Sequence, residues 1–217
     1  TPAFMPVATR ASLKGLTLEH VRRIAPEVML ANTYHLHLRP GESLIESLGG
    51  LHAFTGWDGP ILTDSGGYQV FSLTTLAKVT EDGVRLKSHI DGEPLFLGPR
   101  EAMAVQAALG ADLVMAFDHC LALPAERDAL ADAVERTTRW ARLCDESRTR
   151  DDQALFPALN LVQLALQQCQ PVFDDATVDL DLLLTGAATS QPERPRAGLP
   201  GEVGPHAAQT RCGVLEL

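Results

Sequence analysis

The stretch Pro60 to Leu73 carries residue types that can bind and process a flat ligand. The apolar residues Ile61 and Leu62 lead into Asp64, which is followed closely by a pair of glycines. Glycine has no Cβ atom, so the backbone there can adopt positive φ and approach a ligand closely. A carboxylate can accept hydrogen bonds or exchange protons. The pattern predicts a buried strand that ends in a ligand-binding turn.

Two further residues give this stretch its chemistry. Tyr68 offers a flat ring for stacking, and Asp118 is a second carboxylate that follows an apolar run at 113–117. Asp64 and Asp118 are therefore both expected at the carboxyl ends of strands, where ligand sites collect in (β/α) barrels and in open α/β sheets. The alternative is structural: a solvated Asp64, a packed Tyr68 and an Asp118 that caps a turn.

Alternating strands and helices must position these carboxylates. Apolar runs predict strands at 4–8, 28–31, 61–63 and 112–117. Helical spacing and capping residues predict helices at 18–24, 40–48, 99–109 and 125–148. This alternation indicates an α/β fold with a parallel sheet. Residues 68–97 interrupt it with β-rich segments and turn signals, which predict an inserted antiparallel hairpin after the third strand.

Composition describes a soluble, globular chain of 217 residues with 45% hydrophobic and 21% charged residues. The net charge of -10 argues against nucleic acid as a partner unless a local basic patch exists. No apolar run reaches the ~18 residues of a membrane span. The widely spaced cysteines are expected to be reduced thiols in the cytoplasm; they are Cys120, Cys144, Cys169 and Cys212.

Several motifs accompany the Asp64 stretch in a fixed order. They are Leu30-Ala31-Asn32-Thr33-Tyr34-His35-Leu36, Leu38-Arg39-Pro40-Gly41, Gly49-Gly50-Leu51-His52, Trp57-Asp58-Gly59-Pro60, Lys87-Ser88-His89-Ile90-Asp91-Gly92 and Val114-Met115-Ala116-Phe117-Asp118-His119-Cys120. Over roughly residues 1–156 this series closely resembles the N-terminal half of bacterial members of the tRNA-guanine transglycosylase, or queuine tRNA-ribosyltransferase, family. The resemblance implies a (β/α)8 TIM-type barrel, truncated here to about its first half.

The resemblance also implies a reaction. The family exchanges a guanine at the anticodon wobble position of tRNA for a 7-deazaguanine in queuosine biosynthesis, which is a pentosyl transfer at the ribose. The implied partners are tRNA, guanine or a 7-deazaguanine base, and a second copy of the chain in a homodimer. A cytoplasmic location is expected.

The family's residue roles transfer to matching positions. Asp118 would read the guanine edge, because one carboxylate can accept both N1–H and the 2-amino group. Asp64 would be the general acid/base. Tyr68 would stack on the base, and the same pocket would be lined by Ser65, Gly66 and Gly67. Residues expected to surround these are Asn32, Thr33, His35 and Cys120. For His35 we favour a buried, hydrogen-bonded core position over metal binding or proton transfer.

Residues 157–217 differ in character from residues 1–156, and we interpret them as a divergent, frameshifted or disordered tail. The family's nucleophilic Asp, in a Phe-Asp-Cys-Val motif, is missing there. The family's zinc set, Cys-x-Cys-x-x-Cys plus a His, is also missing, because Cys169, His206 and Cys212 lack that spacing. Zinc is thus expected in full-length relatives and not on this chain, and the chain alone is expected to be inactive. Alternatives are a non-catalytic partner subunit, a purine-binding fragment, or an unrelated barrel enzyme that binds phosphate at 65–67.

Overall fold

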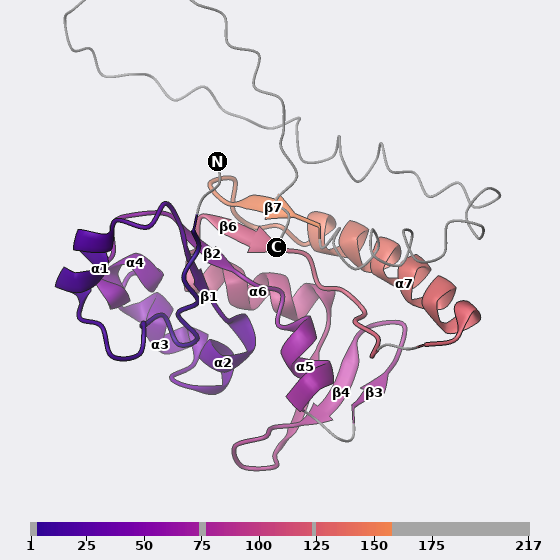
Figure 1. The fold of residues 1–217 in the computed structure, drawn as a ribbon. Coiled ribbons are helices and arrows are strands. Elements are labelled where there is room, and N and C mark those ends of the chain that lie inside the picture. Colours follow the sequence, from indigo (N-terminus) through magenta and orange to yellow (C-terminus); the bar gives the residue numbers. More distant parts are fainter. Residues whose placement is uncertain (1–3, 74–76, 123–124, 158–217) are drawn as a thin grey trace, which may run out of the picture.

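A parallel sheet lies at the centre of the structure (Figure 1). The structure is a computed structural model, and it describes residues 4–73, 77–122 and 125–157. Within these ranges the sheet order is β1-β2-β6-β7, with β1 at Met29–Ala31, β2 at Ile61–Thr63, β6 at Leu113–Met115 and β7 at Ala154–Phe156. All three pairings are parallel. The predicted α/β class with a parallel sheet is confirmed, and the arrangement is consistent with part of a TIM barrel.

The sheet register brings the carboxyl ends of neighbouring strands together. Ala31 lies opposite Thr63, and Thr63 lies opposite Val114. The N–H of Asp64 continues the ladder by donating to the carbonyl of Ala31 at 3.2 Å. The loops that follow β1, β2 and β6 therefore start side by side, as expected for residues that share one site.

The two ends of the described chain differ from the sequence prediction. Residues 4–8 form no full strand, and Val7 makes only an isolated parallel bridge to Leu30. Pro6 accepts a hydrogen bond from the Leu30 N–H but has no N–H of its own, so the ladder does not extend. In contrast, β7 is a strand that was not predicted from the sequence.

Long helices lie close to their predicted positions. α6 spans Pro99–Leu109 and α7 spans Arg127–Glu146, while α1 spans Leu18–Ile24 and begins at a capping box built on Thr17. α3 is shorter than predicted, at Glu42–Ser47. Three short helices were not predicted; they are α2 at Thr33–Leu38, α4 at Gly50–Thr55 and α5 at Gly67–Leu73.

The predicted antiparallel hairpin is present and carries a third strand. The sheet has the order β3-β4-β5, with β3 at Lys78–Val79, β4 at Val84–Lys87 and β5 at Pro94–Leu97. β4 buries Val84 and Leu86 and exposes the residues between and after them. This alternation is the pattern from which the hairpin was predicted.

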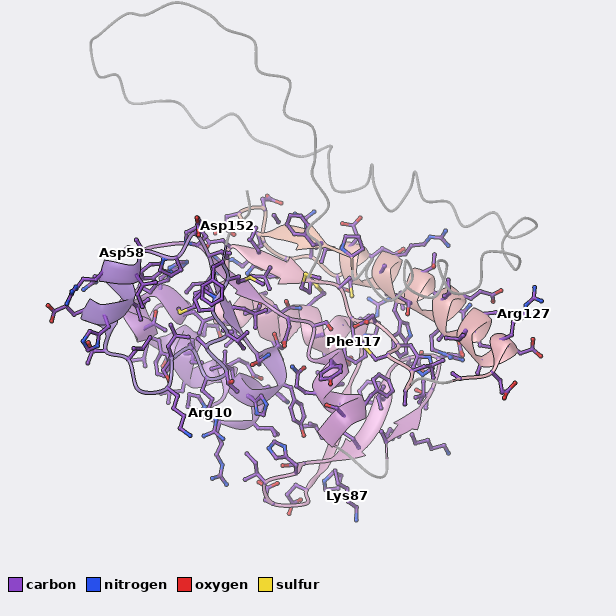
Figure 2. The ribbon with its side chains drawn as sticks, viewed as in Figure 1. Arg10, Asp58, Lys87, Phe117, Arg127 and Asp152 are labelled. Carbon is purple, nitrogen blue, oxygen red and sulfur yellow. The ribbon has the colours of Figure 1, made fainter. Side chains whose placement is uncertain are left out.

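The largest fully buried side chains come from the parallel sheet, the helices and the antiparallel sheet. Figure 2 shows Phe117 in the middle of the molecule, whereas Arg10, Asp58 and Arg127 lie at its periphery. Phe117 and Trp140 are both fully buried, and their ring centroids are 5.2 Å apart. Within the described ranges no helix has the length and apolar character to cross a membrane. The predicted tail at 157–217 lies, apart from its first residue, outside the described residues.

Candidate active site

Asp64 and Asp118 lie in one site. Asp64 directly follows β2, and Asp118 follows the neighbouring strand β6. Ser65, the residue after Asp64, donates its hydroxyl hydrogen to Asp118 Oδ1 at 3.1 Å. Repulsion from the Asp64 carboxylate also contributes to a raised pKa of Asp118. The two carboxylates that the sequence singled out are thus neighbours in space.

Asp118 is buried with only 4% of its surface exposed. Its Oδ1 accepts from Ser65, and its Oδ2 accepts from the Cys120 thiol at 3.1 Å. Burial raises the pKa of Asp118, and these two hydrogen bonds offset only part of that rise. Burial and the adjacent carboxylate likewise raise the pKa of Cys120, which therefore stays a thiol and remains a donor. A carboxylate has about four lone-pair sites, so Asp118 keeps acceptor capacity for a ligand.

Each glycine of the pair has its own structural reason. Gly66 has φ of 78°, in the left-handed region that favours glycine. A Cβ atom on Gly67 would lie 2.8 Å from Asp118 Oδ1 and 3.0 Å from the Asp118 carbonyl oxygen. The N–H of Gly67 donates to Ser65 Oγ at 3.1 Å. The turn therefore closes against Asp118 only because position 67 has no side chain.

Asp64 is surrounded by hydrogen-bond donors. Its Oδ1 accepts from the backbone N–H of Thr33 at 2.8 Å and of Gly66 at 3.2 Å. Its Oδ2 accepts from the side-chain amides of Asn32 and Gln69, the latter at 2.9 Å. Burial raises the pKa of Asp64, and the four donors act in the opposite direction. The carboxylate is oriented firmly, and a proton can reach it only where one of these donors moves away.

Asn32 and Thr33 directly follow β1, and both contact Asp64. Asn32 is the N-cap residue of α2, and Thr33 opens its first turn. The chain turns into a helix directly after β1, so backbone donors as well as side chains face Asp64. Gln69, which was not predicted to belong to the site, lies in the first turn of α5. Its position inside the Pro60–Leu73 stretch was the available signal.

Tyr68 and His35 lie at the edge of this site. The Tyr68 side chain is 68% exposed on α5, so its ring is open to a ligand rather than packed in the core. His35 is only partly buried, contrary to the expected core position, because α2 turns Tyr34 and Leu36 inward instead. The His35 ring lies 5.6 Å from that of His89, and burial together with nearby positive charge lowers its pKa.

Comparison with known proteins identifies the family. The sequence model of the family described as queuine tRNA-ribosyltransferase matches residues 1–166. The chain belongs to the queuine tRNA-ribosyltransferase family. Over 156 residues, or 72% of this chain, it is 58% identical to the queuine tRNA-ribosyltransferase of Pelotomaculum thermopropionicum and 55% identical to that of Moorella thermoacetica. Over 157 residues it is 53% identical to the Staphylococcus aureus protein of the same name.

The match covers the N-terminal portion of these relatives. The chain spans 42% of the Pelotomaculum and Moorella queuine tRNA-ribosyltransferases and 41% of the Staphylococcus protein. The family expectation of zinc finds no matching donor set in the part of the chain that the structure describes, where no group of three or more His, Cys, Asp or Glu side chains is placed to hold a metal. The cysteines described there, Cys120 and Cys144, are buried apart from such a group.

Proposed function

We propose that this chain provides the base-binding part of a tRNA-guanine transglycosylase. The proposed reaction replaces a guanine at the tRNA wobble position with a 7-deazaguanine in queuosine biosynthesis, a ribosyl transfer that we assign to the cytoplasm. The site would lie at the carboxyl ends of strands of a TIM-type barrel. The observation that carries the proposal is that Ser65 joins the Asp64 turn to the buried Asp118 carboxylate.

Asp118 is the proposed reader of the base edge. An ionised carboxylate can accept N1–H and the 2-amino group of guanine as a charge-assisted pair. Ser65 and Cys120 hold the carboxylate by one bond to each oxygen, which fixes its plane and leaves acceptor sites for the base. The exposed ring of Tyr68 is the proposed stacking surface, and Gly67 lets the turn approach Asp118 closely enough.

Asp64 is the proposed general acid/base. Its raised pKa suits a group that takes up a proton, because burial disfavours its charged form. Gln69 is the donor whose movement would free an oxygen most readily, because it lies on the short helix α5 with Tyr68. Attack on the ribose requires the nucleophilic Asp of the family's later motif, which these 217 residues lack. We therefore propose that the chain by itself binds the base and does not exchange it.

The test has a binding arm and an exchange arm. Calorimetry should detect guanine binding to the purified chain, and D118N should weaken it by about 100-fold, because the amide offers N1–H one acceptor and one clashing donor. Labelled guanine should not enter tRNA with this chain alone. Native-like guanine affinity in D118N would refute the assigned role of Asp118, and incorporation of label would refute the proposed lack of exchange.

A non-catalytic partner subunit is the alternative, and its supporting observation is the partial span of the relatives. Adding a full-length relative that lacks activity through a substituted base-reading Asp would separate the two. Restored exchange would favour a subunit that contributes a pocket, whereas the transglycosylase-fragment proposal expects none. Light scattering on the same samples would test the proposed homodimer.

A further inference from the structure

Helix α7 holds the residue that precedes Asp118. The backbone N–H of Phe117 donates to Cys144 Sγ at 3.3 Å. The Phe117 ring also packs against Trp140, with both side chains fully buried. The strand end at β6 is thus attached to α7 through both the backbone and the side chain of one residue.

The same helix holds the residue that follows Asp118. The backbone N–H of His119 donates to Thr137 Oγ1 at 3.0 Å. Its ring atom Nδ1 lies 3.2 Å from Arg136 Nη1. Arginine only donates hydrogen bonds, so Nδ1 must accept, which favours a neutral His119 ring. Burial and the Arg136 charge lower the pKa of His119, in agreement with this assignment.

Arg136 connects this loop to the antiparallel sheet. Its Nε and Nη2 atoms donate to Glu81 Oε1 at 3.1 and 2.8 Å. Glu81 lies in the turn between β3 and β4, and its carbonyl oxygen accepts from Trp140 Nε1 at 2.6 Å. Figure 1 shows α7 running from beside β3 and β4 toward β7. One guanidinium therefore bridges the turn and the loop that contains Asp118.

Arg139 provides an internal comparison. It also binds Glu81, with Nη2 2.8 Å from Oε2. Its side chain is 46% exposed, against 18% for Arg136. In the described part of the chain, Arg139 pairs with glutamates and does not contact His119. Both arginines bind the Glu81 carboxylate, but of the two only Arg136 contacts His119 in the loop that contains Asp118.

We propose that Arg136 is a positioning residue that sets the orientation of Asp118 through His119 and Glu81. This inference rests on the proposed function for its effect on the base. A planar guanidinium with separate donor faces can satisfy both partners at once, whereas a lysine ammonium is a single point charge that reaches one. Phe117 and His119, the two neighbours of Asp118, are both hydrogen-bonded to α7. A shift of the His119 backbone would therefore rotate the Asp118 carboxylate relative to the base.

The experiment compares R136M with R139M in the full chain. Both variants lose one ion pair to Glu81, and both keep an aliphatic stem. R136M should weaken guanine binding by about tenfold in calorimetry, and R139M by less than twofold. Amide hydrogen exchange in residues 117–120 should rise in R136M alone, while the melting temperatures of the two variants stay similar. R136K should bind guanine with intermediate affinity.

Equal guanine affinities in R136M and R139M would overturn the inference, as would equal exchange in residues 117–120. Where R136M melts well below R139M, the R136K variant decides: native exchange and affinity in R136K would assign Arg136 a merely electrostatic role and overturn the inference. Failure of the native chain to bind guanine would refute the proposed function instead. The exchange comparison needs no ligand, so it still decides whether Arg136 positions the loop.

Discussion

At the scale of single residues, Asp118 combines two demands that oppose each other. A base-reading carboxylate must be ionised to accept a pair of hydrogen bonds from the base, yet Asp118 is buried, with Ser65 and Cys120 as its side-chain donors in the described part of the chain. Burial therefore raises the pKa of Asp118, which means that the folded chain is less stable when this carboxyl group is ionised. We therefore expect the ionised Asp118 to lower the folding stability of the free chain while allowing it to bind the base.

The first prediction concerns pH. A carboxyl group whose pKa is higher in the folded than in the unfolded state binds its proton more tightly when folded, so its contribution falls as pH rises from the unfolded pKa through the folded pKa. D118N removes that contribution. At pH 7 the unfolding free energy of D118N should exceed that of the native chain by about 1 kcal/mol. Urea titrations between pH 3 and 8 measure the difference.

The control for this prediction is Asp64, whose pKa is also raised and which is unchanged in both proteins. Apart from its repulsion with Asp118, its effect cancels in the difference between D118N and the native chain. A D118N variant that is less stable than the native chain across the whole pH range would contradict the prediction.

The second prediction concerns Gly67. In G67A the new methyl group would press on Asp118 Oδ1 and on the Asp118 carbonyl oxygen. We expect a loss of about 2 kcal/mol in stability and at least tenfold weaker guanine binding. G92A is the comparison: its φ of 77° strains an alanine, but nothing lies within 4 Å of the added Cβ, so it should lower stability and leave guanine binding unchanged. Thermal melts and calorimetry on both variants check the outcome, and native binding by G67A would contradict the close approach described here.

At the scale of elements, α6 aligns the two strands that lead to the carboxylates. Its buried Gln106 accepts from Thr63 Oγ1 at 2.9 Å and from the Met115 N–H at 3.0 Å. It also donates to the Met115 carbonyl at 3.0 Å. One amide therefore joins the last residue of β2 to the last residue of β6. The relative position of Asp64 and Asp118 depends on this side chain.

The third prediction follows from that amide. Q106L keeps a similar volume but removes the partner of the Met115 N–H and the nearer acceptor of the Thr63 hydroxyl, which should cost about 3 kcal/mol of unfolding free energy. The control is A104L, at an exposed position of the same helix, which should change stability by less than about 0.5 kcal/mol. Denaturant titration distinguishes them. Equal stabilities would show that Gln106 does not join the strands.

Elements with clear start and stop signals were predictable from the sequence. The limits of α6 agree with the prediction because Pro99 opens it and Gly110, with φ of 70°, ends it. The short helix α2 was missed, since its six residues directly after β1 are too few to show an apolar period clearly apart from the strand. In the site, Asp64 and Asp118 were predicted from strand ends. The contact between Arg136 and His119 was not predicted, because no sequence pattern relates a helix side chain to a loop that lies elsewhere in the sequence.

At the scale of the whole molecule, the candidate site draws on most of the fold. The donors and acceptors come from the starts of α2 and α5 and from the segments after β2 and β6. A ligand bound there contacts the folded arrangement as a unit and has no counterpart in the unfolded chain. Binding should therefore stabilise the domain as a whole rather than one loop.

The fourth prediction is that guanine at about 100 times its dissociation constant raises the unfolding free energy by about 2.7 kcal/mol. Amide exchange in β1, β2 and β6 should slow together. A phosphorylated sugar at equal concentration serves as the control and should leave both quantities unchanged. Stabilisation by the sugar and not by guanine would instead favour a phosphate-binding turn at residues 65–67.

The attachment of the Asp118 loop to α7 also bears on how the protein is made. Synthesis proceeds from the N-terminus, so the segments that end in Asp64 and Asp118 leave the ribosome before Thr137 and Cys144 do. Until those later residues emerge, the loop has no anchor on either side of its carboxylate. A nascent chain stalled before residue 144 should consequently expose an unfinished pocket to chaperones and proteases, and the site should become protected only once the helix has been released.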